Sequence, residues 1–227
     1  MTELIVALDV DSIAEEEHLL KTLHGTVSFF KIGLRLFTAH GKRSVELVQR
    51  LGGKVFLDLK FHDIPQTVNH AVHEAQKMGV FSVSLHLSGG AAMLRAAAEV
   101  HPRPKLWGVS VLTSLTSADL HALHPNASVL LMARRLARMG LDNKVDGIIC
   151  SGEDVPVLRK ALGAETLFIA PGIRQSGEPL HDQKRHITPA DAARLGIRYA
   201  VVGRPITKAP DPQAAARTIL SEMRNAA

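Results

Sequence analysis

The stretch Lys-Val-Phe-Leu-Asp-Leu at residues 54–59 has the composition of a β-strand that is buried on both faces. Its apolar residues are nearly continuous rather than alternating, which is typical of a strand in a parallel sheet. Further runs of the same kind recur along the chain at fairly regular intervals. They occupy residues 4–8, 27–31, 81–85, 106–112, 145–150, 167–170 and 199–202.

Segments with helical composition separate these runs. Ser12 and Glu15 have the spacing of a capping box that opens a first helix, and Thr188 and Asp211 each precede a proline at a first helical position. Eight strands that are each followed by a helix-compatible stretch predict an α/β fold, a (β/α)8 TIM barrel in a single domain over residues 1–227. An open, doubly wound sheet is the alternative that the pattern leaves. Other helix-forming segments are residues 91–100, 129–139 and 214–223.

The composition limits the classes of partner. Hydrophobic residues make up 46% of the 227 residues, which is enough to bury a substantial core. The 27 basic and 22 acidic residues give a net charge of +5, which favours anionic ligands. However, the chain has no Lys/Arg-rich tract, and aromatic residues are only 4%, so platforms on which bases could stack are scarce. We therefore expect no nucleic-acid partner.

The N-terminus and the single cysteine indicate a cytoplasmic protein. The first residues lead directly into an apolar strand without a basic region or a cleavage site. No apolar run approaches the roughly 18 residues that a membrane span needs. Cys150 is alone, so no disulfide framework can form, as is usual in a reducing compartment. We expect no membrane partner.

A parallel barrel places its functional site at the C-terminal ends of its strands. The predicted ends carry charged or polar residues although the strands before them are almost wholly apolar. Opposite charges that converge from several strands on one rim indicate a site rather than ordinary solvation. The residues at these ends are Asp9, Lys31, Asp58 with Lys60, His86, Thr113, Cys150 with Ser151, Gly172, and Gly203 with Arg204.

Asp58 and Lys60 are two residues apart on a predicted strand, so both side chains point to the same side. Lys31, which ends the preceding strand, is a plausible further partner. Alternating lysines and aspartates keep one another ionised, because each opposite charge favours the charged form. Such an array could hold a carboxylate beside a leaving group while a lysine acts as an acid. An ion-pair network that only closes the barrel is the alternative, and the spacing does not decide between them.

The last two strand ends predict a phosphate site. Gly203 lets the backbone approach an anion closely, and Arg204 can hold a phosphate through two parallel hydrogen bonds. Gly172 and Arg174 follow the neighbouring strand, and the loops after strands seven and eight are the usual phosphate site of this fold. The twelve histidines are scattered without a metal-binding spacing, so we expect no metal site.

Taken together, these stretches resemble the bacterial orotidine 5′-phosphate decarboxylase family, and the similarity covers essentially the whole chain. The most specific match is Asp-Leu-Lys-Phe-His-Asp-Ile-Pro-Gln-Thr at residues 58–67. Its D-x-K-x-x-D core is shared with a wider suprafamily, whereas the H-D-I-P-x-T extension is highly specific. The other matching stretches are residues 5–9, 30–33, 111–114, 171–174, 182–183 and 202–207.

The resemblance implies decarboxylation of orotidine 5′-monophosphate (OMP) to uridine 5′-monophosphate (UMP), the last step of de novo UMP synthesis. It also implies that no metal or organic cofactor takes part. Lys60 would donate a proton to C6 of the pyrimidine, and Asp58 would lie beside the departing carboxylate. Lys31 and Asp63 would complete the charge network.

The resemblance also implies the substrate contacts and a homodimer. Asp9 and Lys31 would bind ribose hydroxyls, and Thr113 would contact the pyrimidine. Asp63 and Thr67 would reach into the site of the partner subunit. The phosphate would be held by Arg174, Gln183, Gly203 and Arg204, with Gln183 bridging towards the base.

Two other functions remain as alternatives. The first is a magnesium-dependent sugar-phosphate decarboxylase of the same suprafamily, such as the 3-keto-L-gulonate 6-phosphate decarboxylases. Those relatives carry a metal-binding glutamate where this chain has Lys31, and a lysine there repels a cation. The second is a non-catalytic nucleotide-binding barrel, which would be favoured by loss of Lys60 or Asp58, and both are present.

Overall fold

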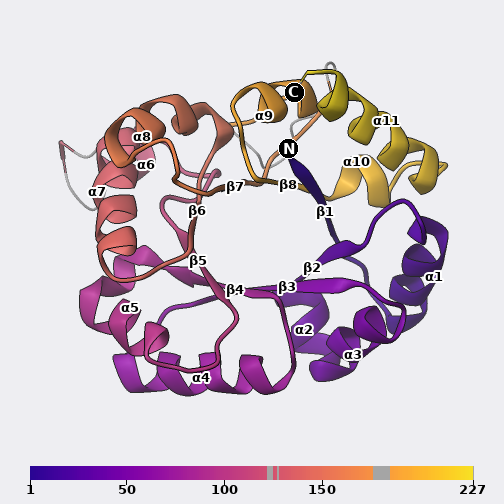
Figure 1. Cartoon of the computed structure of the whole chain (residues 1–227), viewed down its shortest axis with the longest axis horizontal. Helices are drawn as coiled ribbons and strands as arrows, with labels where there is room; N and C mark the ends of the chain where they lie inside the picture. The colour runs from indigo at the N-terminus through magenta and orange to yellow at the C-terminus, as the bar shows by residue number, and fades with distance from the viewer. Residues whose placement is uncertain (122–124, 127, 176–184, 227) are drawn as a thin grey trace.

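The computed structural model describes residues 1–121, 125–126, 128–175 and 185–226, and within them eight parallel strands close into a barrel (Figure 1). The first strand pairs with both the second and the eighth, with Val6 opposite Phe30 and Ile5 opposite Val201. The predicted (β/α)8 barrel is confirmed, and the open sheet is wrong. The strands are β1 (Glu3–Ala7), β2 (Phe29–Gly33), β3 (Lys54–Phe61), β4 (Ser82–His86), β5 (Lys105–Val109), β6 (Gly147–Ile149), β7 (Phe168–Ala170) and β8 (Tyr199–Val202).

Helices surround the barrel, and none of those in the described residues combines the length and the apolar character that crossing a membrane requires. They are α1 (Ile13–Leu23), α2 (Leu34–His40), α3 (Lys42–Arg50), α4 (Pro65–Lys77), α5 (Gly90–Ala98), α6 (Ser117–His121), α7 (Val129–Asp142), α8 (Val155–Leu162), α9 (Pro189–Arg194), α10 (Arg204–Thr207) and α11 (Pro212–Asn225), with 3₁₀ turns η1 (Leu87–Gly89) and η2 (Gly152–Asp154).

The predicted helix caps are present, with one difference. Thr188 forms a complete capping box at α9, and the Asp211 side chain caps α11. The Ser12 hydroxyl accepts the Glu15 N–H at the start of α1, as predicted. The Glu15 carboxylate, however, accepts the N–H of Asp11 instead of that of Ser12, so the box is displaced by one residue.

Two predicted strands are longer than the observed ones by two or three residues. β5 ends at Val109 rather than at residue 112, and β6 spans only residues 147–149 of the predicted 145–150. The apolar pattern continues because Val111 and Cys150 are buried in the core outside the named strands. The apolar pattern therefore indicates which residues are buried, and the buried residues extend beyond those that pair in the sheet.

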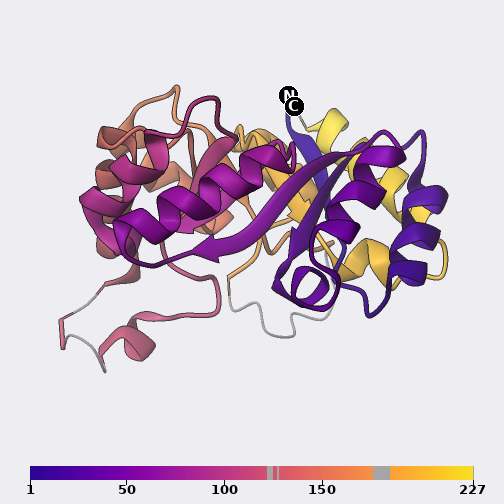
Figure 2. The same ribbon diagram turned by 90° about the horizontal axis from the view of Figure 1, so that it is seen from below.

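The barrel interior explains where the site lies. Alternate strand residues point inward and fill the barrel, with Trp107 packed against Phe56 and Tyr199 at ring centroid distances of 4.6 and 4.8 Å. Further along the strands, the next inward-pointing side chains lie above these packed rings, at the C-terminal rim of the barrel. In Figure 2 the termini lie together at the upper edge of the molecule and α6 protrudes from the lower edge. The inward cluster is Ile5, Ala7, Phe29, Phe56, Trp107, Val109, Ile149, Ile169, Tyr199 and Val201.

Glu16 on α1 is a carboxyl buried between helices. Its Oε1 accepts a hydrogen bond from the Ser44 hydroxyl of α3 at 2.7 Å, and its Oε2 has no hydrogen-bond partner among the described residues. Burial raises the pKa of Glu16 from 4.5 to about 7, and the bond from Ser44 offsets this only in part. The native state therefore holds a proton here over a pH range in which the unfolded chain has released it.

Replacing Glu16 should change how stability depends on pH. The favourable contribution of protonated Glu16 is present below pH 4.5 and is lost as the pH rises to about 7. Between pH 5 and pH 8 we expect Glu16→Gln to gain about 2–3 kcal/mol of unfolding free energy relative to the wild type. Urea unfolding at both pH values measures this difference. The half-exposed neighbour Glu17, replaced by Gln, should show no such gain. A parallel pH dependence of wild type and Glu16→Gln would contradict the expectation.

Candidate active site

A cavity of about 520 Å³ opens at the C-terminal rim of the barrel. Its apolar part is formed by inward strand residues such as Phe56, Val109 and Ile169. Its polar part contains most of the residues predicted for the site. The predicted residues that line it are Asp9, Lys31, Asp58, Lys60, Thr113, Arg174, Gly203 and Arg204.

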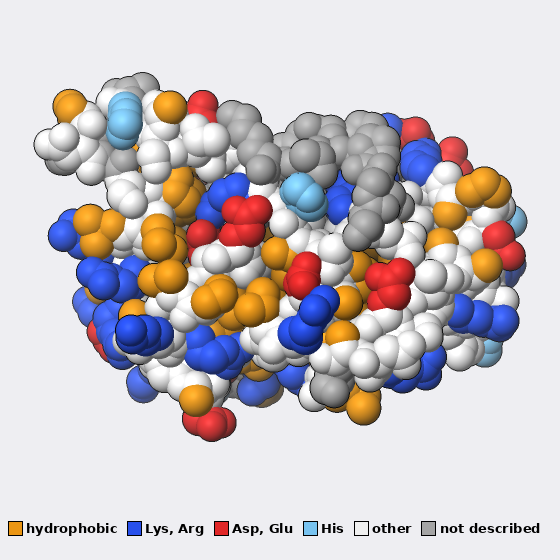
Figure 3. All heavy atoms as spheres, turned by 90° about the horizontal axis from the view of Figure 1, so that it is seen from above, with side chains coloured by type: hydrophobic (Ala, Val, Ile, Leu, Met, Phe, Trp, Pro, Cys, Tyr) orange, Lys and Arg blue, Asp and Glu red, His pale blue; other side chains and the backbone are white. Residues whose placement is uncertain are grey.

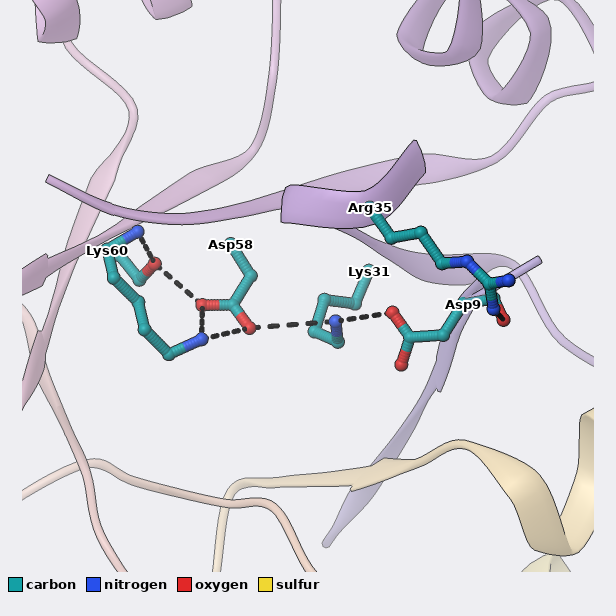
Figure 4. Close-up of polar contacts among 6 residues, drawn as sticks. Asp9, Lys31, Arg35, Asp58 and Lys60 are labelled. Atoms are coloured by element: carbon teal, nitrogen blue, oxygen red, sulfur yellow. Dashed lines mark hydrogen bonds and ion pairs between the residues drawn. The ribbon is translucent and has the colours of Figure 1, made fainter. Parts of the chain in front are cut away.

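Four charged side chains form an alternating row on the β1–β3 side of this cavity (Figure 4). The Lys60 ammonium lies 2.9 and 3.0 Å from the two oxygens of Asp58. The Lys31 ammonium lies 3.6 Å from Asp58 Oδ2 and 3.3 Å from Asp9 Oδ1. The order is therefore Lys60–Asp58–Lys31–Asp9, and Asp9 is the last member of the row among the described residues.

Asp58 stays ionised in a buried position. Burial alone would raise the pKa of its carboxyl, but the charges of Lys31 and Lys60 and a hydrogen bond from Ser84 outweigh that effect. The pKa of Asp58 is therefore held below its ordinary value. Only 11% of the Asp58 side chain is exposed, so water screens its charge weakly.

The backbone at Lys60 departs from a regular strand. Its φ of 52° lies in the left-handed region, which costs a non-glycine residue about 1–3 kcal/mol. The pairing of β3 with β4 shifts register between Leu57 and Phe61, around this residue. The Lys60 side chain thus contacts Asp58 from an irregular segment. The expected regular strand, in which residues two apart point to the same side, is not present here.

Gly33 leaves room for the centre of the row. A Cβ atom at this position would lie 2.8 Å from the Lys31 ammonium and 3.2 Å from Asp9 Oδ1. A larger residue would displace one of these groups. Glycine here therefore permits the Lys31–Asp9 contact.

The side of the cavity formed by β7 and β8 is cationic. Arg174 is only 6% exposed, and its guanidinium donates to the Ile173 carbonyl at 2.9 Å. Arg204 begins α10 directly after Gly203. These residues lie where the sequence predicted a phosphate site. Gln183, which was predicted beside them, lies outside the described residues.

Asp63 and Thr67 lie outside the residues that line this cavity in the described part of the chain. Both are exposed, Asp63 just before α4 and Thr67 in the first turn of that helix. The Asp63 carboxylate accepts the Ile64 backbone N–H at 2.7 Å. Their predicted role across a subunit interface stays a prediction.

Comparison with known proteins identifies the family. The sequence profile of the orotidine 5′-phosphate decarboxylase / HUMPS family matches residues 2–219. The chain belongs to this family. The orotidine 5′-phosphate decarboxylase of Geobacter metallireducens is 42% identical to it over 228 residues, covering 97% of this chain and 95% of that protein. The corresponding protein of Opitutus terrae is 43% identical, with coverages of 98% and 99%.

A solved structure agrees with this membership. The crystal structure of orotidine 5′-phosphate decarboxylase from Lactobacillus acidophilus has a TM-score of 0.85 to this chain at 33% sequence identity. The match covers 98% of this chain and 99% of the other. The resemblance found from the sequence is therefore confirmed at the level of both sequence and fold.

Sequence reasoning missed three polar residues of this family member's site. Arg35 and Lys208 line the cavity, and Arg35 also forms an ion pair with Asp11. Ser84 is buried on β4 and contacts both Asp58 and Lys60. The polar residues Ser82, Ser84 and His86 alternate with apolar ones in the strand that follows residues 58–60, and this alternation was the signal that could have identified Ser84.

His86 is half-buried at the end of β4, and Cys150 is buried just after β6. The rings of His86 and His62 lie 5.3 Å apart, and burial, followed by the charges of His62 and Lys60, lowers the pKa of His86. Cys150 is a free, buried thiol whose pKa is raised by burial. A raised thiol pKa disfavours the nucleophilic thiolate form.

Proposed function

We propose that this chain converts OMP to UMP and carbon dioxide, the last step of de novo UMP synthesis. The single observation that carries the proposal is the row Lys60–Asp58–Lys31–Asp9, which lies in one cavity with Arg174 and Arg204. Membership of the family, and relatives named orotidine 5′-phosphate decarboxylase over nearly the full length, support it.

Lys60 is the proton donor in this proposal. When the bond between C6 and the carboxylate breaks, the electron pair stays on C6 in the plane of the ring, where no π system accepts it. Only electrostatic stabilisation and proton transfer remain to lower the barrier. The Lys60 ammonium supplies a positive charge and then a proton to C6, and it regains the proton from solvent. Its two contacts with Asp58 hold it in place.

Asp58 places a negative charge beside the carboxylate that leaves. Its low pKa, maintained by Lys31 and Lys60 against the effect of burial, keeps it ionised. Two carboxylates at close range repel each other, and the repulsion ends when the substrate's carboxylate leaves as neutral carbon dioxide. Asp58 therefore disfavours the substrate more than the transition state.

The remaining contacts bind the substrate away from C6. Asp9 and Lys31 are assigned to the ribose hydroxyls and Thr113 to the pyrimidine, as the family resemblance implies. Binding energy from a distant phosphate can support the chemical step by fixing the reacting ring in position. The phosphate is assigned to Arg174, Gln183, Gly203 and Arg204.

The position of Lys31 supports chemistry without a metal. Its ammonium lies between the carboxylates of Asp9 and Asp58, where a bound cation would otherwise balance both charges. A lysine that is itself a cation repels Mg²⁺ from this place. We infer that neither a metal nor an organic cofactor takes part, in contrast to the magnesium-dependent alternative.

We also infer that the partner is a small molecule and not a nucleic acid. On the side where α8, α9 and α11 lie, Lys and Arg side chains are interspersed with Asp and Glu side chains (Figure 3). Nucleic-acid binding favours a stripe of one charge. We further propose that residues 1–227 act as one domain in the cytoplasm, where the thiol of Cys150 stays reduced.

A parallel assay of two substrates tests the proposed function. The purified chain is given OMP in one sample and 3-keto-L-gulonate 6-phosphate in another, and UMP and carbon dioxide are measured. We expect turnover of OMP alone. Turnover of the sugar phosphate alone would favour the other branch of the suprafamily, and binding of UMP without turnover of OMP would favour a non-catalytic barrel.

The active unit proposed here is a homodimer in which Asp63 and Thr67 complete the site of the partner subunit. Both are exposed and lie away from the cavity of their own chain. Ile64 and Leu34, which follow the neighbouring strands β3 and β2, are large apolar residues that are 67% and 55% exposed. Ile64 directly follows Asp63 in the chain, and exposed apolar side chains of this kind favour burial against a second subunit.

Hybrid dimers test this arrangement. Mixing subunits that carry Asp63→Ala with subunits that carry Lys60→Ala should restore activity, because one site of each hybrid then receives both native groups. Random pairing predicts about one quarter of the wild-type activity. The control mixes Asp58→Ala with Lys60→Ala. Both residues belong to the row that a single chain supplies to its own site, so no hybrid site contains both and no activity should be restored. If the first mixture is as inactive as the second, the shared site is wrong.

A further inference from the structure

The Ser84 hydroxyl links the two groups on which the proposed chemistry depends. It accepts a hydrogen bond from the backbone N–H of Lys60 at 2.8 Å and donates one to Asp58 Oδ1 at 2.7 Å. Ser84 is fully buried, so water does not compete for either bond. One hydroxyl therefore contacts both the backbone of the proposed proton donor and the carboxylate that faces it.

The pairing of the strands explains why a side chain is needed here. Leu57 of β3 pairs with Val83 of β4, and the next pair joins Phe61 to Leu85. Residues 58–60 thus lie opposite Ser84 alone, as in an enlarged β-bulge. A bulge leaves backbone groups without hydrogen-bond partners on the neighbouring strand. The Ser84 hydroxyl accepts the hydrogen bond from one of them, the N–H of Lys60.

The hydrogen bond from the Lys60 N–H to Ser84 also holds an unusual backbone conformation at Lys60. Lys60 has a φ of 52°, in the left-handed region that residues with a side chain rarely adopt. Such a conformation persists where the surroundings hold it. The described contacts that hold it include the Ser84 hydroxyl at the Lys60 N–H and Asp58 at the Lys60 ammonium.

We propose that Ser84 is a positioning residue for the decarboxylation: it holds Lys60 in its left-handed conformation and orients the carboxylate of Asp58 towards the two lysines. The inference rests on the proposed function, because OMP turnover is its readout. The hydroxyl acts through Asp58 and Lys60, whose side chains line the cavity.

The hydroxyl also affects protonation. Burial pushes the pKa of Asp58 upward, and after the charges of Lys31 and Lys60 the hydrogen bond from Ser84 is the next contribution that lowers it. Removing the hydroxyl therefore raises the pKa of Asp58. The acidic limb of the pH profile of kcat/KM should move to higher pH, because this limb follows ionisation of an essential carboxylate in the free enzyme.

The test compares Ser84→Ala with Ser82→Ala. Ser82 lies on the same strand and is equally buried, and its hydroxyl has no hydrogen-bond partner among the described residues. We expect Ser84→Ala to lower kcat about 10- to 100-fold through misplacement of Lys60 and Asp58, with a small change in KM. The acidic limb should also shift in this variant. Ser82→Ala should change neither quantity, and Ser84→Thr, which retains the hydroxyl, should recover part of the loss in kcat.

Each outcome distinguishes the two proposals. If the wild type does not turn over OMP, the proposed function is wrong. If the wild type is active and Ser84→Ala keeps both its kcat and its acidic limb, the inference about Ser84 alone is wrong. An equal loss in Ser84→Ala and Ser82→Ala without a pH shift would assign the serines a merely structural role. Thermal unfolding and UMP affinity of each variant show whether the fold and the site are retained.

Discussion

Lys60→Ala is expected to lower turnover of OMP by about 10⁴-fold or more while UMP binding stays measurable. The change removes both the cation nearest to the developing negative charge and the proton that replaces carbon dioxide. Contacts to ribose and phosphate come from other residues and remain. Steady-state kinetics gives kcat, and calorimetry with UMP gives the affinity. A variant that keeps its activity would overturn the assignment of Lys60 as proton donor.

Two further variants sharpen this result. Lys144 is the other non-glycine residue with a positive φ in the described part of the chain, and it is exposed. Lys144→Ala therefore makes the same chemical change at the same kind of backbone and should leave kcat unchanged. Lys60→Arg retains a charge that does not release its proton in proteins. Its kcat should stay low, and near-native turnover would show that charge alone is sufficient.

Arg204→Ala is expected to lower kcat/KM for OMP by about 10²-fold, because a bidentate, charge-assisted contact to the phosphate is lost. The effect on orotidine, which lacks the phosphate, should be small. Kinetics with both substrates separates the phosphate contact from a general disturbance of the site. Arg35→Ala is the matched control, since Arg35 lines the same cavity, lies outside the proposed phosphate site and forms an ion pair with Asp11. An equal loss with OMP and orotidine would contradict the phosphate assignment.

Much of the fold could be predicted from the sequence because burial on both faces leaves a local pattern. Each strand of the barrel lies within or next to a nearly continuous apolar run, and Thr188 and Asp211 begin the helices they were expected to begin. The same pattern made two strands too long, since Val111 and Cys150 are buried outside the strands. Helix α6 in the connection after β5 is too short to leave a clear periodicity.

The rim of the site was also predictable, because residues two apart on a strand share a face. Asp9 follows Ile5 and Ala7 on the inward side of β1, and Asp58 follows Phe56 on that of β3. The role of Ser84 was not predictable in this way. It depends on the register between β3 and β4 and on the left-handed backbone of Lys60, and neither is encoded by local spacing.

The contributions expected across a subunit interface remain predictions for a different reason. Asp63 and Thr67 were assigned through the family resemblance, and a single chain places them on its surface. Gln183 was assigned in the same way and lies outside the described residues. Hybrid dimers test the first two residues.

The most direct test follows conversion of OMP to UMP by absorbance with the purified chain in the presence of a chelator. The row Lys60–Asp58–Lys31–Asp9 needs no metal to supply positive charge, since Lys31 and Lys60 provide it. We therefore expect the same rate with and without EDTA, and no increase when Mg²⁺ is added. No UMP formed by the folded protein, or a rate abolished by EDTA and restored by Mg²⁺, would contradict this expectation.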